Sequence, residues 1–329
     1  MKRSLTALFV LGSFALLSAQ GKDAAEVLAD ARQALGGTQL ESLKSLSGKG
    51  RTLRSTPRGD TVETEFEVAF ELPDKYRLRT ALMPMGNMTI YREIGFNAGR
   101  LIEQVDRPPN LSGGMVHIRV AGPGGPVDPE KMTPEQKAEF ERQRVLANKK
   151  EYARLALGLF AASPGFPLEF AYAGEAEAPD GKADVIDVKG PGDFAARLFV
   201  DQATHLPLML SWMDKEPLTI RMGPGGPSWT AGGGGGGTVV QRLEQRSGPM
   251  SKEEREKLEK EMEEARAKAE ADRRTVEFRV YYADYREVGG VRLPHRIQRS
   301  IDGKAAEEME FDSLKVNAKI DARTFEPTK

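Results

Sequence analysis

Three kinds of residue in this chain could take part in chemistry: histidines, carboxylates and glycine-rich runs. The three histidines, His117, His205 and His295, are far apart, and none has the spacing of a zinc site. We therefore interpret each of them as a strand or turn residue. No Gly-x-Ser-x-Gly sequence is present, so the sequence does not predict a hydrolase with the α/β-hydrolase triad.

Carboxylates are abundant, but no pair is singled out by its spacing. Asp184 and Asp187, for example, lie on one short segment. Acid–base catalysis needs two carboxylates held at a set separation in a cleft, which sequence spacing alone does not establish. The glycine run 232–237 leads into Thr238 rather than the Lys-Ser/Thr of a phosphate loop, so we interpret it as a linker. We predict a protein that is not an enzyme and needs no cofactor or metal. A hydrolase built from scattered carboxylates is the least favoured alternative.

Residues 1–19 have the pattern of a secretory signal peptide. Lys2 and Arg3 precede an apolar run over residues 5–17, and the small residues Ser18 and Ala19 follow it. We predict cleavage after Ala19, with an uncleaved N-terminal anchor as the alternative. The run is short for a bilayer span, so we do not expect an integral membrane protein.

The amino-acid composition limits where in the cell the protein can be expected and which classes of partner it can bind. The chain has no cysteine, which excludes disulfides, cysteine nucleophiles and a lipid-modified N-terminal cysteine. Its formal net charge of −1 provides no global attraction for nucleic acid. We expect a periplasmic protein, soluble after cleavage, in which residues 20–329 form one domain.

The elements that would position a binding site are mostly strands. Over residues 61–72, apolar side chains such as Phe66, Val68 and Phe70 alternate with polar ones, which predicts one buried and one solvated face. The same period of two recurs over residues 48–55, 76–83, 87–96, 100–105, 168–172, 183–189, 194–201, 206–213, 276–285, 291–300, 305–311 and 313–316. This series predicts an α+β, β-dominated fold, with a curved antiparallel sheet or incomplete β-barrel and helices on its concave face.

Helices and two insertions interrupt the strands. Residues 24–35 predict an amphipathic helix that ends at Gly36. Thr133, Pro134 and Gln136 predict a capped helix that is charged at its start and apolar over residues 152–160. The Gly/Pro-rich insertions lie at about residues 107–150 and 214–274, and the second contains a charged helix at 251–274. We expect residues 108–133 and 223–249 to be flexible, because they bury too little apolar surface to offset the entropy of ordering.

Several short motifs, taken in order, resemble those of the LolA/LolB-like outer-membrane lipoprotein-sorting proteins. Residues 24–37 are similar to the opening helix of that family. Residues 72–77 resemble a recurrent turn between strands, residues 200–207 a central hairpin and residues 285–294 a late hairpin. This resemblance implies an incomplete antiparallel barrel whose mouth is closed by helices around a hydrophobic cavity for acyl chains.

The bulky side chains on the apolar strand faces are the candidate binding residues. They either line a cavity for a lipid or acyl chain, or form a plain core against the helices at 24–35 and 152–160. A modest groove suffices for binding, because each buried methylene contributes about 0.8 kcal/mol. The predicted cavity-lining residues are Phe66, Val68, Phe70, Tyr76, Leu78, Leu82, Met88 and Ile90.

The favoured function is therefore a non-enzymatic periplasmic carrier that binds a lipid or an acylated lipoprotein in a hydrophobic cavity. The alternative is an envelope scaffold or sensor that binds a protein partner through its charged helices. The two differ in what they require, because a carrier needs an apolar cavity and a scaffold needs only a packed core and an exposed helix face.

Overall fold

One antiparallel sheet forms the body of the molecule. The computed structural model describes residues 22–55, 61–85, 88–105, 132–178, 181–223, 226–231 and 267–326, with a few single positions between 251 and 264. Twelve strands lie in the order β5-β4-β3-β2-β1-β14-β13-β12-β9-β8-β7-β6. Because β5 and β6 form the two edges, the sheet is open rather than closed into a barrel. The strands are β1 (Ser45–Ser55), β2 (Thr61–Glu71), β3 (Lys75–Met85), β4 (Met88–Asn97), β5 (Arg100–Val105), β6 (Glu169–Ala178), β7 (Gly181–Gly190), β8 (Phe194–Asp201), β9 (Pro207–Lys215), β12 (Thr275–Val288), β13 (Val291–Ile301) and β14 (Lys304–Val316).

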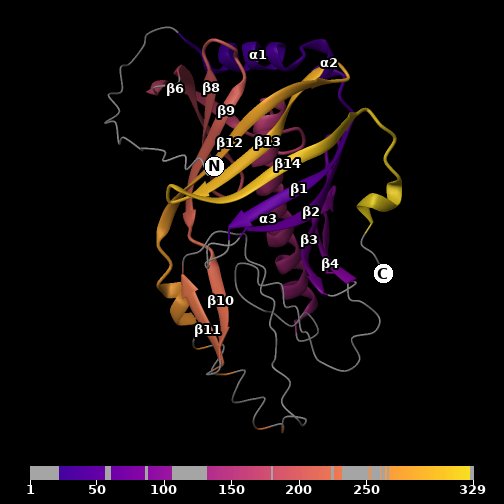
Figure 1. The fold of residues 1–329 in the computed structure, drawn as a ribbon, viewed down its shortest axis with the longest axis vertical. Helices are drawn as coiled ribbons and strands as arrows, with labels where there is room; N and C mark the ends of the chain where they lie inside the picture. The colour runs from indigo at the N-terminus through magenta and orange to yellow at the C-terminus, as the bar shows by residue number, and fades with distance from the viewer. Residues whose placement is uncertain are drawn as a thin grey trace, which may run out of the picture.

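The strands alternate as the sequence predicts. In β2, Phe66, Val68 and Phe70 are buried, while Glu63 and Glu65 are exposed. This period of two places one face of the sheet on the core and the other in solvent. The predicted β-dominated fold with a curved antiparallel sheet is confirmed, and Figure 1 shows its curvature.

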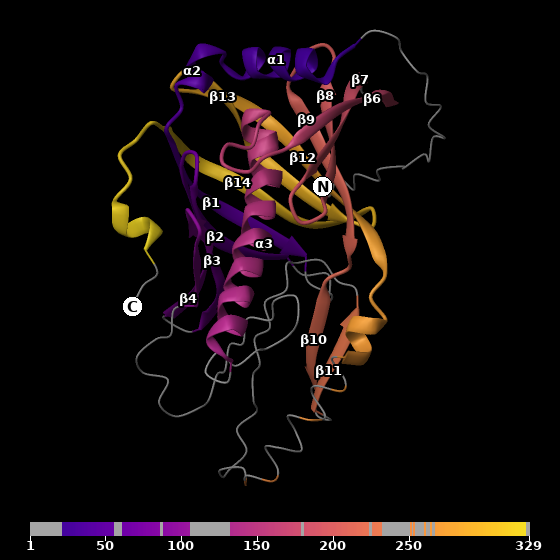
Figure 2. The ribbon, with the colours of Figure 1, turned by 180° about the vertical axis from the view of Figure 1, so that it is seen from behind.

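Helices α1 and α3 cover the concave side of the sheet. Helix α1 (Ala24–Leu35) lies across one end of the sheet, and α2 (Thr38–Glu41) follows it. Helix α3 (Pro134–Phe160) runs along the concave face, as Figure 2 shows. Its 27 residues make it about 40 Å long. The apolar side of α1 and the second half of α3 join the strands in one hydrophobic core.

Three of the described helix ends carry capping signals, of which Gly36 and the capping box at Thr133 were predicted from the sequence. The Asp23 side chain accepts a hydrogen bond from the Ala25 amide, and Gly36, with φ of 140°, ends α1. Thr133 and Gln136 form the predicted capping box at the start of α3. Among the described helices, none is both long enough and apolar enough to cross a membrane.

Two parts of the chain differ from the prediction. The sequence suggested separate strands at 305–311 and 313–316, but β14 is continuous. Gly50 pairs with Phe311 while Lys49 pairs with Ser313, so Asp312 is the extra residue of a β-bulge. The bulge interrupts the alternating pattern without ending the strand.

The predicted insertions lie mostly outside the described residues. Residues 108–131 and 232–249 belong to that undescribed part, so their expected flexibility remains a prediction. Within the second insertion, β10 (Leu218–Gly223) and β11 (Gly226–Ala231) pair as a hairpin that the sequence analysis did not predict. Of the charged helix at 251–274, residues 267–271 are described and helical, and Ala269 is buried there.

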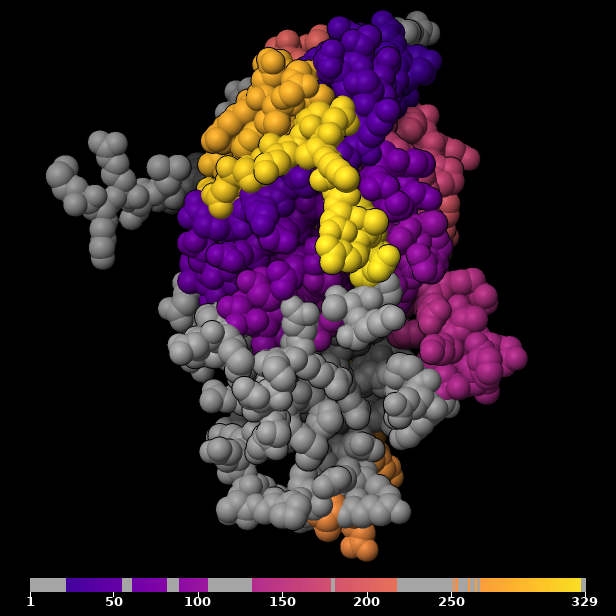
Figure 3. All heavy atoms as spheres, turned by 90° about the vertical axis from the view of Figure 1, so that its right-hand side faces the viewer, coloured from indigo at the N-terminus to yellow at the C-terminus, as the bar shows by residue number. Residues whose placement is uncertain are grey.

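A short C-terminal segment covers part of the convex face. The 3₁₀-helix η2 (Ala322–Phe325) contributes Phe325, which is fully buried against Ala69 and Ile102. The Asn97 side chain also donates a hydrogen bond to the Phe325 carbonyl oxygen at 3.2 Å. Figure 3 shows this segment lying over the N-terminal strands, where it buries apolar side chains that would otherwise face solvent.

Candidate functional site

Helix α3 is fixed to the concave face by close packing and by hydrogen bonds at several points. Asn148 donates to the Gly95 carbonyl oxygen at 3.0 Å, and the Tyr282 hydroxyl donates to the Arg154 carbonyl oxygen at 3.0 Å. At Gly158 the helix approaches β12 so closely that a Cβ atom there would lie 2.0 Å from the Tyr282 ring. The sequence therefore needs glycine at this position for the helix to lie against β12.

An aromatic cluster holds the centre of α3. Tyr152 packs against Phe70, Tyr76 and Phe96 with ring centroids 5.8, 5.6 and 5.4 Å apart. Its hydroxyl donates to the Pro164 carbonyl oxygen at 2.8 Å. Burial raises the pKa of the Tyr152 hydroxyl well above its ordinary value, so the phenol is neutral at physiological pH.

The predicted cavity-lining residues divide between this core and the cavity described below. Phe66, Val68, Phe70 and Ile90 are buried in the sheet, with no more than 2% of their surface exposed. Tyr76 and Leu78 line the cavity. The side chains of Leu82 and Met88 lie outside the described part of the chain.

A cavity of about 1240 Å³ lies between α3 and the concave face. Strands β3 and β4 supply one wall, strands β8, β9 and β12 supply another, and β1, β13 and β14 lie between them. A volume of this size exceeds that of most sites for small ligands and is sufficient for a lipid-sized molecule.

Charged residues line part of the cavity. Its described lining contains ten arginine or lysine residues and six aspartate or glutamate residues. Among them, Arg54, Glu307 and Arg299 form one row across β1, β14 and β13, because Glu307 pairs with both arginines in the sheet register. The three side chains share the concave face because each occupies an inward-facing position of its strand.

Helix α3 adds further charges. Glu151 lies 3.5 Å from the Arg299 guanidinium and also binds Arg154. Burial raises the pKa of the Glu151 carboxyl, but Arg154 and Arg299 more than offset this, so its pKa is lowered. Arg144 forms a bidentate pair with Glu103 of β5, which fixes the other flank of the helix.

Glu103 is shared between two arginines. Besides Arg144, it lies 3.8 Å from Arg92. Burial lowers the pKa of the Arg92 guanidinium, and the nearby charges of Arg144 and Arg54 lower it further, although Glu103 opposes both. Arg92 retains its charge at physiological pH, since an arginine pKa lies far above 7. The arginines of β1, β4 and α3 are therefore each held beside a carboxylate in this part of the cavity.

The opposite part of the cavity is aromatic and apolar. Trp212 and Phe278 stack with centroids 5.3 Å apart and an interplanar angle of 12°. The Arg154 guanidinium lies 4.4 Å from the Trp212 ring centroid, in cation–π geometry. Val280, Phe194 and Ala196 extend this apolar lining. The cavity is thus amphipathic, with a region of paired charges and an apolar region.

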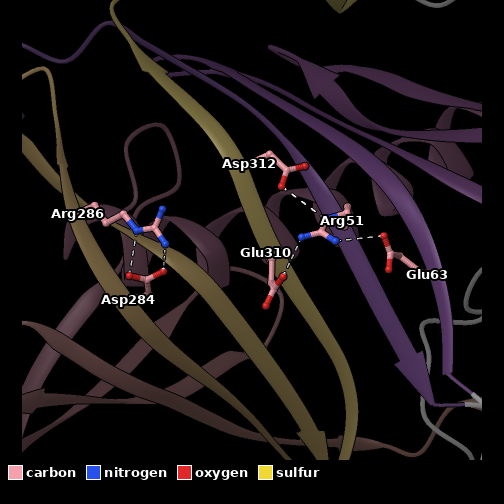
Figure 4. Close-up of polar contacts among 6 residues, drawn as sticks. All are labelled: Arg51, Glu63, Asp284, Arg286, Glu310 and Asp312. Carbon is pink, nitrogen blue, oxygen red and sulfur yellow. Dashed lines mark hydrogen bonds and ion pairs between the residues drawn. The ribbon is translucent and has the colours of Figure 1, made fainter.

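A second polar cluster lies on the convex face. Arg51 on β1 contacts Glu63, Glu310 and Asp312, as Figure 4 shows. The distances are 3.4 Å to both Glu63 and Glu310 and 3.5 Å to Asp312. The Arg51 side chain is 45% exposed, so these contacts are screened by solvent and contribute little to stability. Arg51 is a useful comparison for Arg54, because the two arginines lie on opposite faces of one strand.

Of the other candidates for chemistry, Asp187 is among the residues that line the cavity, whereas His205, His295 and Asp184 are not. His205 occupies the turn between β8 and β9, and His295 is buried on β13 with its Nδ1 3.1 Å from the Leu293 carbonyl oxygen. His117 lies outside the described residues. Asp184 is buried and accepts hydrogen bonds from Lys22, Tyr172 and Gln202. The described residues contain no group of three or more histidines, cysteines or carboxylates suited to a metal ion.

The cavity arginines were not among the site residues predicted from the sequence. The alternation of the strands does indicate which way they face. Arg54, Arg92 and Arg299 each lie two residues from an inward-facing residue of the same strand, namely Thr52, Ile94 and Ile297 respectively. An arginine at an inward-facing strand position must find a partner or a wet cavity, because burial of an unpaired charge is costly.

No family model and no curated protein matches this chain. Solved structures do match. One is a LolA superfamily protein from Nitrosomonas europaea, with 10% identity, a TM-score of 0.44, and coverage of 92% of this chain and 98% of that chain. The second, a DUF1329 family protein from Desulfovibrio piger, has 8% identity, a TM-score of 0.44, and coverage of 93% and 98%.

The third structure is an outer membrane lipoprotein-sorting protein domain from Vibrio parahaemolyticus. It has 9% identity and a TM-score of 0.42, with coverage of 92% of this chain and 97% of that chain. The first of these structures is named as a member of the LolA superfamily, and the third is named for outer-membrane lipoprotein sorting.

Proposed function

We propose that this protein is a non-enzymatic carrier that binds a lipid or an acylated lipoprotein in the cavity between α3 and the concave face. The observation that supports the proposal is the amphipathic cavity of about 1240 Å³ beneath a single long helix. A closed core would fill this space with side chains, because protein interiors pack as densely as organic crystals. The apolar lining around Trp212 and Phe278 is suited to an acyl chain.

We also propose that the carrier acts in the bacterial periplasm. The apolar run at residues 5–17, which follows Lys2 and Arg3, supports this location. Cell fractionation tests it directly. Recovery of the full-length protein in the cytoplasmic fraction, with residues 1–19 still attached, would contradict the proposal.

The carrier function is tested by filling the cavity. Ala147 of α3 lines it, so Ala147→Trp should occupy part of the ligand volume. Ala138 is exposed on the same helix, and Ala138→Trp is the matched control. Each protein is purified from its own envelope, analysed by native mass spectrometry and extracted for lipid. We expect lipid in the wild type and in Ala138→Trp, and several-fold less in Ala147→Trp.

Two results would count against the carrier. One is consistently empty wild-type protein. The other is an equal lipid content in Ala147→Trp and Ala138→Trp when thermal unfolding shows that both are folded. Empty protein that instead co-purifies with a protein partner, lost on deletion of residues 251–274, would favour the scaffold or sensor.

A further inference from the structure

We infer that the cavity selects an amphiphile whose headgroup is zwitterionic and carries a primary ammonium group, such as phosphatidylethanolamine. Glu151 of α3 accepts hydrogen bonds from the ammonium group, and Arg299 of β13 donates hydrogen bonds to the phosphate. This inference rests on the proposed function and deepens it. Its basis is a row of alternating charges that crosses β1, β14 and β13 and continues onto α3.

The charges of this row are matched. Glu307 lies opposite Arg54 and Arg299 in the sheet register, and it is 3.4 Å from Arg54. On the other side of Arg299, the Glu151 carboxylate lies 3.5 Å from the guanidinium. Two arginines therefore stand beside two glutamates, and the charged row has no net charge. The four members of the charged row, all of which line the cavity, are Arg54, Glu307, Arg299 and Glu151.

Matched charges of alternating sign are complementary to a zwitterion. A headgroup with a net negative charge would bring an unmatched charge into the cavity, and burial of an unpaired charge is costly. A zwitterionic headgroup brings one charge of each sign and adds no net charge. Its phosphate is attracted to an arginine and its ammonium group to the neighbouring glutamate, so the charged row favours it over an anionic headgroup.

Arg299 and Glu151 are the neighbouring pair that a ligand can reach best. Their side chains are 31% and 40% exposed, against 12% for Glu307. Their separation of 3.5 Å is longer than the roughly 2.7–2.9 Å of a charge-assisted hydrogen bond. A guanidinium has several N–H donors and a carboxylate accepts at both oxygens, so each group keeps capacity for a ligand. Glu151 uses its Oε1 atom for Arg154, which leaves Oε2, the oxygen nearer Arg299, for an ammonium group.

The apolar lining next to Arg299 is suited to the acyl chain of such a lipid. Arg299 pairs with Val280 on β12, and Phe278 of the same strand pairs with Trp212 on β9. All four residues line the cavity. A headgroup on Arg299 would therefore place its acyl chain along Val280 toward the stacked Trp212 and Phe278 rings.

The experiment measures headgroup preference. Delipidated protein is incubated with vesicles of equal amounts of phosphatidylethanolamine, phosphatidylcholine and phosphatidylglycerol with matched acyl chains, separated from them, and analysed by native mass spectrometry. Phosphatidylcholine has the same net charge but a quaternary ammonium group without N–H donors, and phosphatidylglycerol has a net negative charge. We expect the wild type to bind phosphatidylethanolamine about tenfold over each of the others, which corresponds to about 1.4 kcal/mol.

Glu151→Gln tests the carboxylate and should reverse the order of the lipids. It removes the acceptor of the ammonium group and leaves the charged row with an unmatched arginine, so phosphatidylglycerol should become the preferred lipid. Glu139→Gln is the matched control, because Glu139 is an exposed glutamate of the same helix that pairs with Arg142, and it should keep the wild-type order. Thermal unfolding establishes that both variants are folded.

A second measurement needs no variant. Vesicles that contain N-methyl- or N,N-dimethyl-phosphatidylethanolamine replace the N–H donors one at a time at constant charge, and binding by the wild type should fall stepwise toward that of phosphatidylcholine. Equal binding of phosphatidylethanolamine and phosphatidylcholine, or a wild-type preference for phosphatidylglycerol, would overturn the headgroup inference and leave the carrier intact. An unchanged lipid order in folded Glu151→Gln would also overturn it. Binding of none of the lipids would overturn both. Glycerophosphoethanolamine that competes as well as the intact lipid would refute the amphiphile.

Discussion

Truncation of Tyr152 tests whether the aromatic cluster holds α3 on the sheet. Tyr152 is 1% exposed and packs against three aromatic rings, while its hydroxyl donates one hydrogen bond of 2.8 Å. Loss of a buried aromatic ring costs about 3–5 kcal/mol. Loss of the hydroxyl alone costs about 1 kcal/mol, the net value of a typical hydrogen bond. We therefore expect Tyr152→Ala to be far more destabilising than Tyr152→Phe.

The assay is equilibrium unfolding in urea, followed by circular dichroism and by the binding of a dye that recognises exposed apolar surface. Tyr152→Ala should lower the free energy of unfolding by about 3–5 kcal/mol. It should also increase dye binding before the main transition, because a loosened α3 exposes the cavity. A loss below about 1 kcal/mol, or equal losses in the two variants, would refute the idea that ring packing fixes the helix.

Three further predictions follow from single contacts. Gly158→Ala should lower the free energy of unfolding by about 1–3 kcal/mol, because the added Cβ overpacks against the Tyr282 ring. This loss should occur although alanine is the better helix former. A rise in melting temperature would contradict the prediction. Asp184→Asn should lower the free energy of unfolding by about 1.5–3 kcal/mol, because it weakens the hydrogen bonds of a buried carboxylate that also pairs with Lys22. The control is Asp187→Asn, which changes an exposed ion pair on the same strand and should lower it by less than about 1 kcal/mol. Equal losses in a thermal unfolding assay would refute the role of burial at Asp184. Finally, burial raises the pKa of four tyrosine hydroxyl groups above 10.0, those of Tyr76, Tyr152, Tyr282 and Tyr285. Their contribution to the free energy of unfolding is complete below about pH 10 and is lost as the pH rises through the folded-state pKa values. Tyrosinate absorbance and loss of the strand signal in circular dichroism should therefore appear together at alkaline pH; titration of these phenols near pH 10 in a folded protein would contradict the prediction.

Local patterns in the sequence determined most of the elements. The predicted helix at 24–35 and strand at 194–201 have the bounds of α1 and β8. This agreement has a physical cause, since capping residues and the period of two act over a few neighbouring residues and are readable from the chain itself. The predicted strand break near Asp312 failed because a bulge changes the local alternation without changing the pairing.

Only the tertiary structure decided which inward-facing residues form the core and which line the cavity. Phe70 and Leu78 both lie on apolar strand faces, yet Phe70 is buried under Tyr152 of α3, while Leu78 faces the cavity. The path of α3 over the sheet makes that difference, and Gly158 fixes the path by allowing close approach to β12. Strand pairing likewise brings together Arg54 and Arg299, which are far apart in the sequence. Alternation specifies only the face on which a side chain lies, whereas burial and charge pairing depend on contacts between distant segments, which exist only once the sheet and helix have assembled.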